Sequence, residues 1–234
     1  MRNNSFGILS IFANDFTLMT QDAGLTTHNS QLTTKNIYII RHGQTDFNVR
    51  QVVQGRGVNS DLNDTGIQQA KLFFEAHKEI KFDVVYTSSL KRTWQTVDSF
   101  ISKKIPHIAL PNLDEIDWGI FEGVEHHPDL QKTYYDIINE WKNGNLTIKI
   151  EGGESAQDLA DRLAPFIEEL HQSEAQTILV CTHGRTLRVL ICLLLGKPIQ
   201  QMDEFEHQNT CLYHLEMNNG HFQLLKENDI AHLS

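Results

Sequence analysis

YIIRHGQTDFN, residues 38–48, joins an apolar run directly to Arg41 and His42. Residues 37–40 are apolar at every position rather than at alternate positions, which predicts a central strand covered on both faces of a sheet. A glycine and several small polar residues follow, so the strand is expected to end at this point. The sequence therefore places an arginine and a histidine at the end of a rigid, buried strand.

Short apolar runs and amphipathic segments alternate along the rest of the chain. Strands are predicted within 36–41, 82–88, 107–115 and 177–182, and helices within 65–80, 90–101, 129–144, 155–172 and the apolar segment ending at 196. A hairpin is predicted within 210–228, with its turn at Asn218-Asn219-Gly220. The alternation predicts an α/β fold, a three-layer sandwich with a mostly parallel central sheet flanked by helices.

Two of the predicted helices have recognisable starts. Asp64 is the expected N-cap of helix 65–80. Ser155 and Asp158 have capping-box spacing at the start of helix 155–172, and Pro165 is expected to bend that helix. No GxSxG motif surrounds Ser155, so capping explains it better than a serine-hydrolase nucleophile.

Composition narrows the class of protein. The length of 234 residues suits one α/β domain, and 40% hydrophobic residues suffice for a core. The formal net charge of −10 argues against nucleic-acid and membrane partners, so an anionic substrate would need a local positive pocket. The sequence has three cysteines, Cys181, Cys192 and Cys211. Their odd number and the absence of a CxxC motif indicate buried thiols rather than disulfides or a zinc site.

The N-terminal 35 residues have a different character. They are rich in Thr, Asn, Gln and Ser, which predicts a flexible extension before a domain at 36–228 and a tail at 229–234. FGILSIFA, residues 6–13, resembles the apolar part of a signal peptide, but Asn14 and Asp15 interrupt it and no cleavage site follows. No run approaches the roughly 18 apolar residues of a membrane span. A cytoplasmic location is expected, and Met19 is an alternative start.

Side chains of complementary chemistry follow four of the predicted strands: Arg41-His42, Thr87-Ser88 with Arg92, Glu115, and Thr182-His183-Gly184. Ligands bind at the carboxyl ends of such strands. Two guanidiniums beside two imidazoles would form a nest for a dianionic tetrahedral group. One neutral histidine could attack phosphorus, the other, protonated, could stabilise the oxygens, and the glutamic acid could protonate the leaving oxygen. These residues predict phosphoryl transfer.

Five blocks of the sequence resemble the histidine phosphatase superfamily, in its phosphoglycerate-mutase-like branch. They are RHGQTDFN (41–48), QGRGVNSDLNDTGIQQA (54–70), YTSSLKRTWQT (86–96), LDEIDWGIFEG (113–123) and VCTHG (180–184). They occur in the family's order, and the resemblance runs from about residue 36 to 228. One departure is GRGVNSDLN, which is longer than the family's turn and lacks its proline, so the shape of this loop is in doubt.

The resemblance implies catalytic roles for five residues. His42 would be the nucleophile and become phosphohistidine. Arg41, Arg92 and His183 would hold the phosphoryl oxygens. Glu115 would donate a proton to the leaving oxygen and later activate water.

Further residues would shape the phosphate pocket. Asn48 and the turn at Gln54 and Gly55 would border it, and Gly184 would let its backbone approach the phosphoryl group. The resemblance implies no metal and no cofactor, because the arginines supply the counter-charge.

The segment 116–151 is expected to form a short helical cap that sets specificity together with residues 51–61. Its basic residues are only Lys132, Lys142 and Lys149, among more numerous acidic residues. Mutases of the family carry a longer, more basic insertion, so a phosphatase acting on a small phosphorylated metabolite with few further negative groups is favoured. A mutase and a non-catalytic phosphate-binding module are the alternatives. The sequence does not determine the oligomeric state, and a homodimer is compatible with it.

Several other residues have ordinary explanations. His126-His127 is expected to lie in a solvated loop rather than to bind a metal. Arg188, near the start of a helix with Arg185, is expected to form a structural ion pair. Trp118 and Phe121 either wall the substrate pocket or pack the loop.

Overall fold

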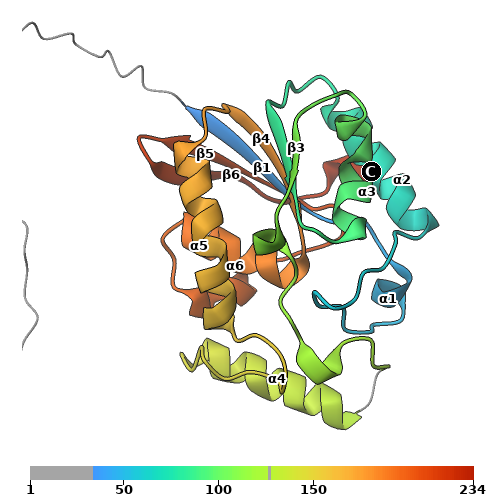
Figure 1. Ribbon diagram of the computed structural model, residues 1–234, viewed down its shortest axis with the longest axis vertical. Coiled ribbons are helices and arrows are strands. Elements are labelled where there is room, and N and C mark those ends of the chain that lie inside the picture. The colour runs from blue at the N-terminus through green and yellow to red at the C-terminus, as the bar shows by residue number, and fades with distance from the viewer. Residues whose placement is uncertain (1–33, 126–127) are drawn as a thin grey trace, which may run out of the picture. The chain divides into compact units, whose positions relative to one another are not determined.

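A six-stranded sheet organises the part of the chain that the computed structural model describes, residues 34–125 and 128–234 (Figure 1). The strands are β1 (Lys35–Arg41), β2 (Val84–Thr87), β3 (His107–Ala109), β4 (Thr177–Thr182), β5 (Leu212–Asn218) and β6 (His221–Asp229). Their spatial order is β3-β2-β4-β1-β5-β6. The first four strands are parallel, β5 is antiparallel to β1, and β6 is antiparallel to β5. The predicted mostly parallel α/β sheet is confirmed.

The helices alternate with these strands. They are α1 (Asp46–Val49), α2 (Asp64–His77), α3 (Lys91–Ile101), α4 (Pro128–Lys142), α5 (Ala156–Gln172) and α6 (Gly184–Leu194). Short 3-10 helices occupy Pro111–Leu113, Gly119–Phe121, Ile199–Glu204 and Ala231–Leu233. The longer predicted helices are all present, with ends shifted by a few residues.

The two predicted helix starts differ in outcome. Ser155 and Asp158 form the expected capping box of α5, and Pro165 lies inside that helix. The N-cap of α2 is Asn63 rather than Asp64, because the Asn63 side chain accepts the Gly66 N–H at 2.9 Å. The prediction for Asp64 was wrong by one residue, since both residue types cap helices well.

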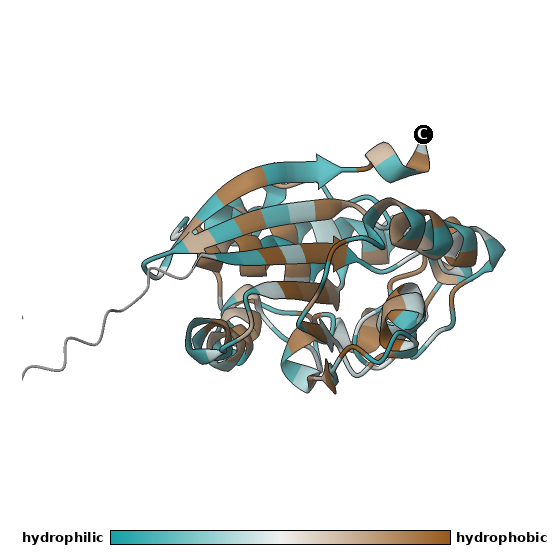
Figure 2. Cartoon of the chain, turned by 90° about the horizontal axis from the view of Figure 1, so that it is seen from above, coloured by the Kyte–Doolittle hydropathy of each residue, from teal (hydrophilic) through white to brown (hydrophobic). Residues whose placement is uncertain are grey.

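Hydrophobic side chains pack on both faces of the sheet. Ile37 and Ile39 of β1 belong to a cluster with residues of α4, α5 and α6. Ile40 points to the other face and belongs to a cluster with Phe73 of α2 and Phe100 of α3. Because side chains alternate along a strand, an all-apolar strand supplies both clusters. Brown hydrophobic residues run along the strands in Figure 2, and the last residues of the edge strand β6 are hydrophilic.

The C-terminal part follows the predicted hairpin. Asn219 and Gly220 both have positive φ, 52° and 77°, as a two-residue type I′ turn requires. After β6, the 3-10 helix places the His232 ring 5.3 Å from the Phe73 ring of α2, so residues of the predicted tail pack on the domain.

The predicted extension lies outside the described residues as far as residue 33, and Lys35 already belongs to β1. His126-His127 also lies outside them. Within the described ranges, no helix is long and apolar enough to cross a membrane.

The register of the parallel strands brings their carboxyl ends together. Arg41 is level with Thr182, and Thr87 is level with Cys181. The segments that follow β1, β2 and β4 therefore leave the sheet side by side, as predicted for a site at this edge.

Candidate active site

His42 lies directly after β1 and is 3% exposed. Its backbone N–H donates to Thr182 O at 2.9 Å, which extends the pairing of β1 with β4. Nδ1 lies 2.7 Å from Gly43 O, and a carbonyl can only accept, so Nδ1 carries the proton and Nε2 has a free lone pair. Burial and the nearby Arg92 and Arg41 hold the pKa of His42 well below its usual range. The imidazole is therefore neutral and has the tautomer of a nucleophile.

His183 is the N-cap of α6, and its ring centroid lies 5.2 Å from that of His42. Its Nδ1 accepts Arg92 Nε–H at 3.2 Å, and its Nε2 donates to Ser88 Oγ at 2.8 Å. Burial and the charge of Arg92 hold its pKa well below the usual value. The expected protonated second histidine is thus not found, because a guanidinium occupies the nitrogen that would take the proton.

Neutral buried histidines predict a specific pH dependence of stability. The unfolded chain protonates His42 below about pH 6.5, whereas the native protein keeps it neutral. The unfolded state then binds more protons, so the free energy of unfolding falls as pH falls. Between pH 6 and 5, His42→Gln should reduce this slope by about 1 kcal/mol per pH unit.

Urea denaturation at several pH values measures the free energy of unfolding of each protein, which is then expressed relative to its own value at pH 8. At pH 8 the histidine is neutral in both states, so the reference removes any packing effect of the substitution. Parallel curves for the wild type and His42→Gln would contradict a neutral native His42.

Arg92 is fully buried in the first turn of α3. Besides the contact with His183, its Nη1 donates to Val58 O at 2.6 Å and its Nη2 to Gly55 O at 3.3 Å. Burial lowers the pKa of Arg92 to about 10, which leaves the group cationic at neutral pH. Arg92 thus connects the loop that carries Gly55 to His183.

Arg41 offers an unused hydrogen-bond donor. Its Nη1 donates to His207 O at 2.8 Å, whereas its buried Nε has no partner among the described residues. A buried donor without a partner costs free energy, and a site for an anion is one reason to keep it. A Cβ on Gly184 would lie 3.6 Å from this Nε and only 2.4 Å from His207 Cδ2, so any larger residue here would displace the His207 ring.

Glu115 follows the 3-10 helix Pro111–Leu113 and is buried. Its carboxylate accepts the backbone N–H groups of Ile116, Arg185 and Thr186, at 3.0, 3.1 and 3.0 Å, and the Thr186 hydroxyl at 3.0 Å. The first turn of α6 therefore binds this carboxylate, as helix N-termini do. Burial lowers the pKa values of Arg41 and Arg92, and the negative charge of Glu115 opposes this lowering at both guanidiniums.

Asn209 is a site residue that the sequence did not reveal. Its Nδ2 donates to His42 O at 3.0 Å and to Asn48 Oδ1 at 3.3 Å. It precedes β5, whose pairing with β1 brings it to His42. No motif marks it, and only the strand order could have found it.

The predicted pocket residues Asn48 and Gln54 shape the loop after β1. Asn48 completes a capping box with Thr45 at the start of α1. Gln54 donates to Thr45 Oγ1 at 2.8 Å and accepts from Ser60 Oγ at 2.6 Å. These hydrogen bonds hold the loop that contains GRGVNSDLN, which is longer than the corresponding turn of the family.

Arg162 of α5 holds the loop that carries Glu115. Its guanidinium donates to the backbone carbonyls of Pro111, Asn112, Asp114 and Glu115 at 2.8–3.3 Å. It also forms a two-point ion pair with Glu154, at 2.8 and 2.9 Å. The side chain of Arg162 thus fixes the path of the backbone that leads to Glu115.

Arg162→Met is expected to lower the free energy of unfolding by roughly 3 kcal/mol, because it removes the two-point ion pair with Glu154 and the hydrogen bonds to four loop carbonyls. Lys149→Met is the matched control, since the Lys149–Asp158 pair is about half exposed and such pairs contribute about 0–1 kcal/mol. Chemical denaturation measures both. Equal losses would show that the Arg162 contacts do not hold the loop.

The predicted cap segment contains the 3-10 helix Gly119–Phe121 and α4. Trp118 is buried, with its ring 5.8 Å from the Trp141 ring of α4. Phe121 is also buried and lines a cavity of about 410 Å³.

Arg188 forms the expected ion pair, with Asp203 at 2.8 Å. Arg185 pairs with the same carboxylate at 2.6 Å and donates to Tyr134 OH at 3.2 Å. In the described ranges, no group of three His, Cys, Asp or Glu side chains is placed to hold a metal ion.

Comparison with known proteins agrees with this geometry. The family model described as histidine phosphatase superfamily (branch 1) matches residues 37–230. Phosphoserine phosphatase 1 of Hydrogenobacter thermophilus is 28% identical over 199 residues, covering 84% of this chain and 93% of the relative. A 2,3-bisphosphoglycerate-dependent phosphoglycerate mutase of Mesorhizobium japonicum is 29% identical over 182 residues, covering 74% and 87%.

A solved structure has the same fold. The alpha-ribazole phosphatase of Shigella flexneri superimposes with a TM-score of 0.74 at 28% identity, covering 83% of this chain and 96% of that chain. Both phosphatases and mutases thus occur among the similar proteins.

Proposed function

Because the chain belongs to the histidine phosphatase superfamily, we propose that it is a phosphatase that hydrolyses monoesters of small metabolites through a phosphohistidine on His42. The observation that carries this proposal is the neutral His42 near Arg41, whose Nε has no partner in the part of the chain that the structure describes, and near the cationic Arg92. A nucleophile and its counter-charges are thereby present in one buried site.

The first step forms a bond between His42 Nε2 and phosphorus and breaks the bond between phosphorus and the ester oxygen. Arg41 and Arg92 stabilise the equatorial oxygens, where negative charge is concentrated. His183 contributes by holding the guanidinium of Arg92 in place. The departing oxygen takes a proton from Glu115.

Glu115 needs its proton when substrate is bound. Four hydrogen-bond donors fix the position of its carboxyl group. In the first step the proton of this carboxyl leaves on the alcohol, so the step ends with an ionised Glu115. In the second step, ionised Glu115 takes a proton from water, the water oxygen bonds to phosphorus, and the bond to Nε2 breaks. The products are phosphate and neutral His42.

The cap supports a phosphatase over a mutase. Lys132 and Lys149 are engaged by Asp136 at 2.6 Å and Asp158 at 2.9 Å, both in exposed pairs. A mutase has to retain a bisphosphate between its two transfers, which requires positive charge in the cap. Conversion of 3- to 2-phosphoglycerate with added 2,3-bisphosphoglycerate tests this alternative. A rate of mutase conversion above the rate of hydrolysis would show that the protein is a mutase.

Phosphate release from p-nitrophenyl phosphate tests the proposed function. We expect turnover that is unchanged by EDTA, because arginine side chains supply the positive charge. Activity lost in EDTA and restored by a divalent metal would contradict the mechanism. Orthophosphate binding without hydrolysis across a broad panel of esters would indicate a phosphate-binding module instead.

A further inference from the structure

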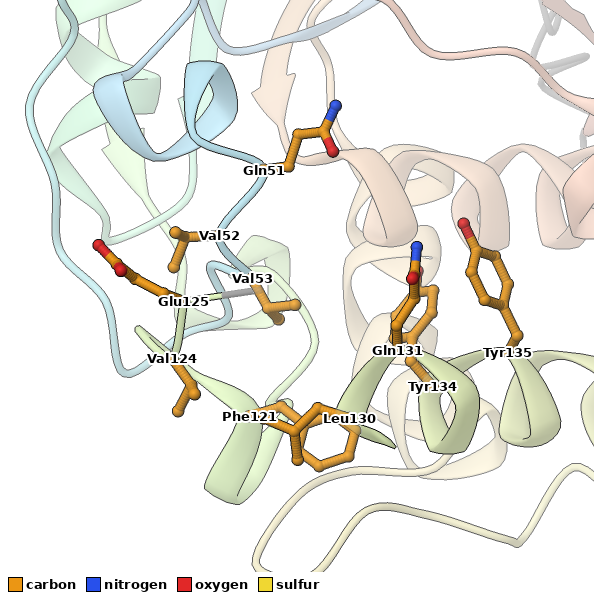
Figure 3. Close-up of a pocket in the computed structure, with 10 residues that line it drawn as sticks. All are labelled: Gln51, Val52, Val53, Phe121, Val124, Glu125, Leu130, Gln131, Tyr134 and Tyr135. Atoms are coloured by element: carbon orange, nitrogen blue, oxygen red, sulfur yellow. The ribbon is translucent and has the colours of Figure 1, made fainter. Parts of the chain in front are cut away.

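The cavity of about 410 Å³ lies between the segment after α1 and the cap helix α4 (Figure 3). Most of its lining is aliphatic or aromatic. The lining residues are Gln51, Val52, Val53, Phe121, Val124, Glu125, Leu130, Gln131, Tyr134 and Tyr135. Figure 3 shows Gln51 and Val53 on one side, and Gln131, Tyr134 and Tyr135 of α4 on the other.

Both walls of this pocket lead to the proposed phosphoryl site. Val53 directly precedes Gln54, which is bonded to Thr45 in the loop after His42. On the opposite wall, Tyr134 OH accepts from the side chain of Arg185, whose backbone N–H donates to Glu115 Oε2. These contacts thus link one wall of the pocket to the loop after His42 and the other wall to a residue that binds Glu115.

The positive charges near the pocket are already engaged. Arg185, behind Tyr134, pairs with Asp203, and its guanidinium lies 6.0 Å from the Trp118 ring and 5.8 Å from the Trp141 ring. Arg50, at the end of α1, lies 3.6 Å from Glu125.

The lining itself carries little charge. Glu125 is the only charged residue among the described lining residues, and its carboxylate points away from α4 in Figure 3. A carboxylate or second phosphate on the alcohol would thus meet glutamines, tyrosines and apolar side chains. Desolvating such an anion without a partner is unfavourable.

We propose that this pocket binds the alcohol part of the substrate and selects monoesters of uncharged, largely apolar or aromatic alcohols. Esters whose alcohol carries a carboxylate or a second phosphate are disfavoured. The inference rests on the proposed phosphatase function and adds the substrate class to it. Burying a hydrocarbon body in such a pocket, compared with leaving it in water, corresponds to roughly a tenfold to hundredfold gain in binding.

A matched pair of esters tests this inference. Pentyl phosphate and 5-(phosphonooxy)pentanoate have the same chain length and similar leaving groups, and differ in one terminal carboxylate. We expect kcat/KM to be at least about tenfold higher for pentyl phosphate at pH 7.5. A ratio of one or less would overturn the inference.

A cation placed in the pocket should reverse the preference. Gln131→Lys should lower the ratio of the two kcat/KM values at least about fivefold, because the lysine can pair with the carboxylate. Thr133→Lys adds the same charge two residues further along α4, outside the lining, and should leave the ratio unchanged. Equal effects of both variants would also overturn the inference.

The proposed function can fail separately. If neither pentyl phosphate, 5-(phosphonooxy)pentanoate nor p-nitrophenyl phosphate is hydrolysed, the phosphatase proposal is overturned and the inference falls with it. If p-nitrophenyl phosphate is hydrolysed and pentyl phosphate is not preferred, only the assignment of this pocket is overturned.

Discussion

His42→Ala is expected to lower kcat/KM for p-nitrophenyl phosphate by at least about a thousandfold, because the variant has no side-chain nitrogen to attack phosphorus. Brief reaction of the wild type with ³²P-labelled substrate, followed by denaturation, should trap label that is stable in base and lost in acid, as a phosphoramidate is. The variant should trap none. Its expected effect is large because Arg41 and Arg92 position and stabilise the phosphoryl group but cannot replace the nucleophile.

The matched control is His221→Ala. His221 is exposed at the start of β6, and alanine there should retain full activity and labelling. Melting temperatures of all three proteins separate loss of chemistry from loss of folding. Turnover of His42→Ala within tenfold of the wild type would exclude the phosphohistidine on this residue.

Glu115→Gln should affect esters according to their leaving groups. Pentyl phosphate leaves as a strongly basic alkoxide unless it is protonated, so we expect a loss of at least about a hundredfold. The nitrophenolate of p-nitrophenyl phosphate needs little protonation, so its transfer to His42 should slow only a few-fold. Single-turnover rates measure this first step apart from the attack of water.

The comparison of two esters also controls for structural damage. The amide of glutamine would place an N–H donor or an oxygen where Glu115 Oε2 now accepts the Arg185 N–H, and local packing can shift. Such a shift slows both substrates alike, whereas loss of the acid slows only the poor leaving group. Equal losses for the two esters would therefore argue against Glu115 as the proton donor.

The sequence predicted the catalytic edge because strand ends carry recognisable chemistry. An all-apolar run before Arg41 and His42, and a second before His183, indicate buried parallel strands whose ends meet. Arg92 and Glu115 follow β2 and β3, so the strand order brings their segments to the same edge, where Arg162 fixes the path of the chain into Glu115. These residues lie where the α/β pattern predicted.

Other parts of the site depend on contacts that no local pattern contains. Asn209 reaches His42 because β5 pairs with β1 from the far end of the chain. Burial and the charge of Arg92 lower the pKa of His183, and sequence alone does not set which of its nitrogens is protonated. The wrong N-cap at Asp64 has a similar cause, because Asn63 and Asp64 are equally suited and the turn geometry decides.

Arg162 has a consequence for how this protein can change over evolutionary time. Its four loop contacts are with backbone carbonyls, so they depend on the path of the chain and not on which residues occupy positions 111 and 112. Mutations at these two positions can accumulate without displacing Glu115, provided that Arg162 and Glu154 persist. A directed-evolution library could therefore vary position 111 while the acid stays in place.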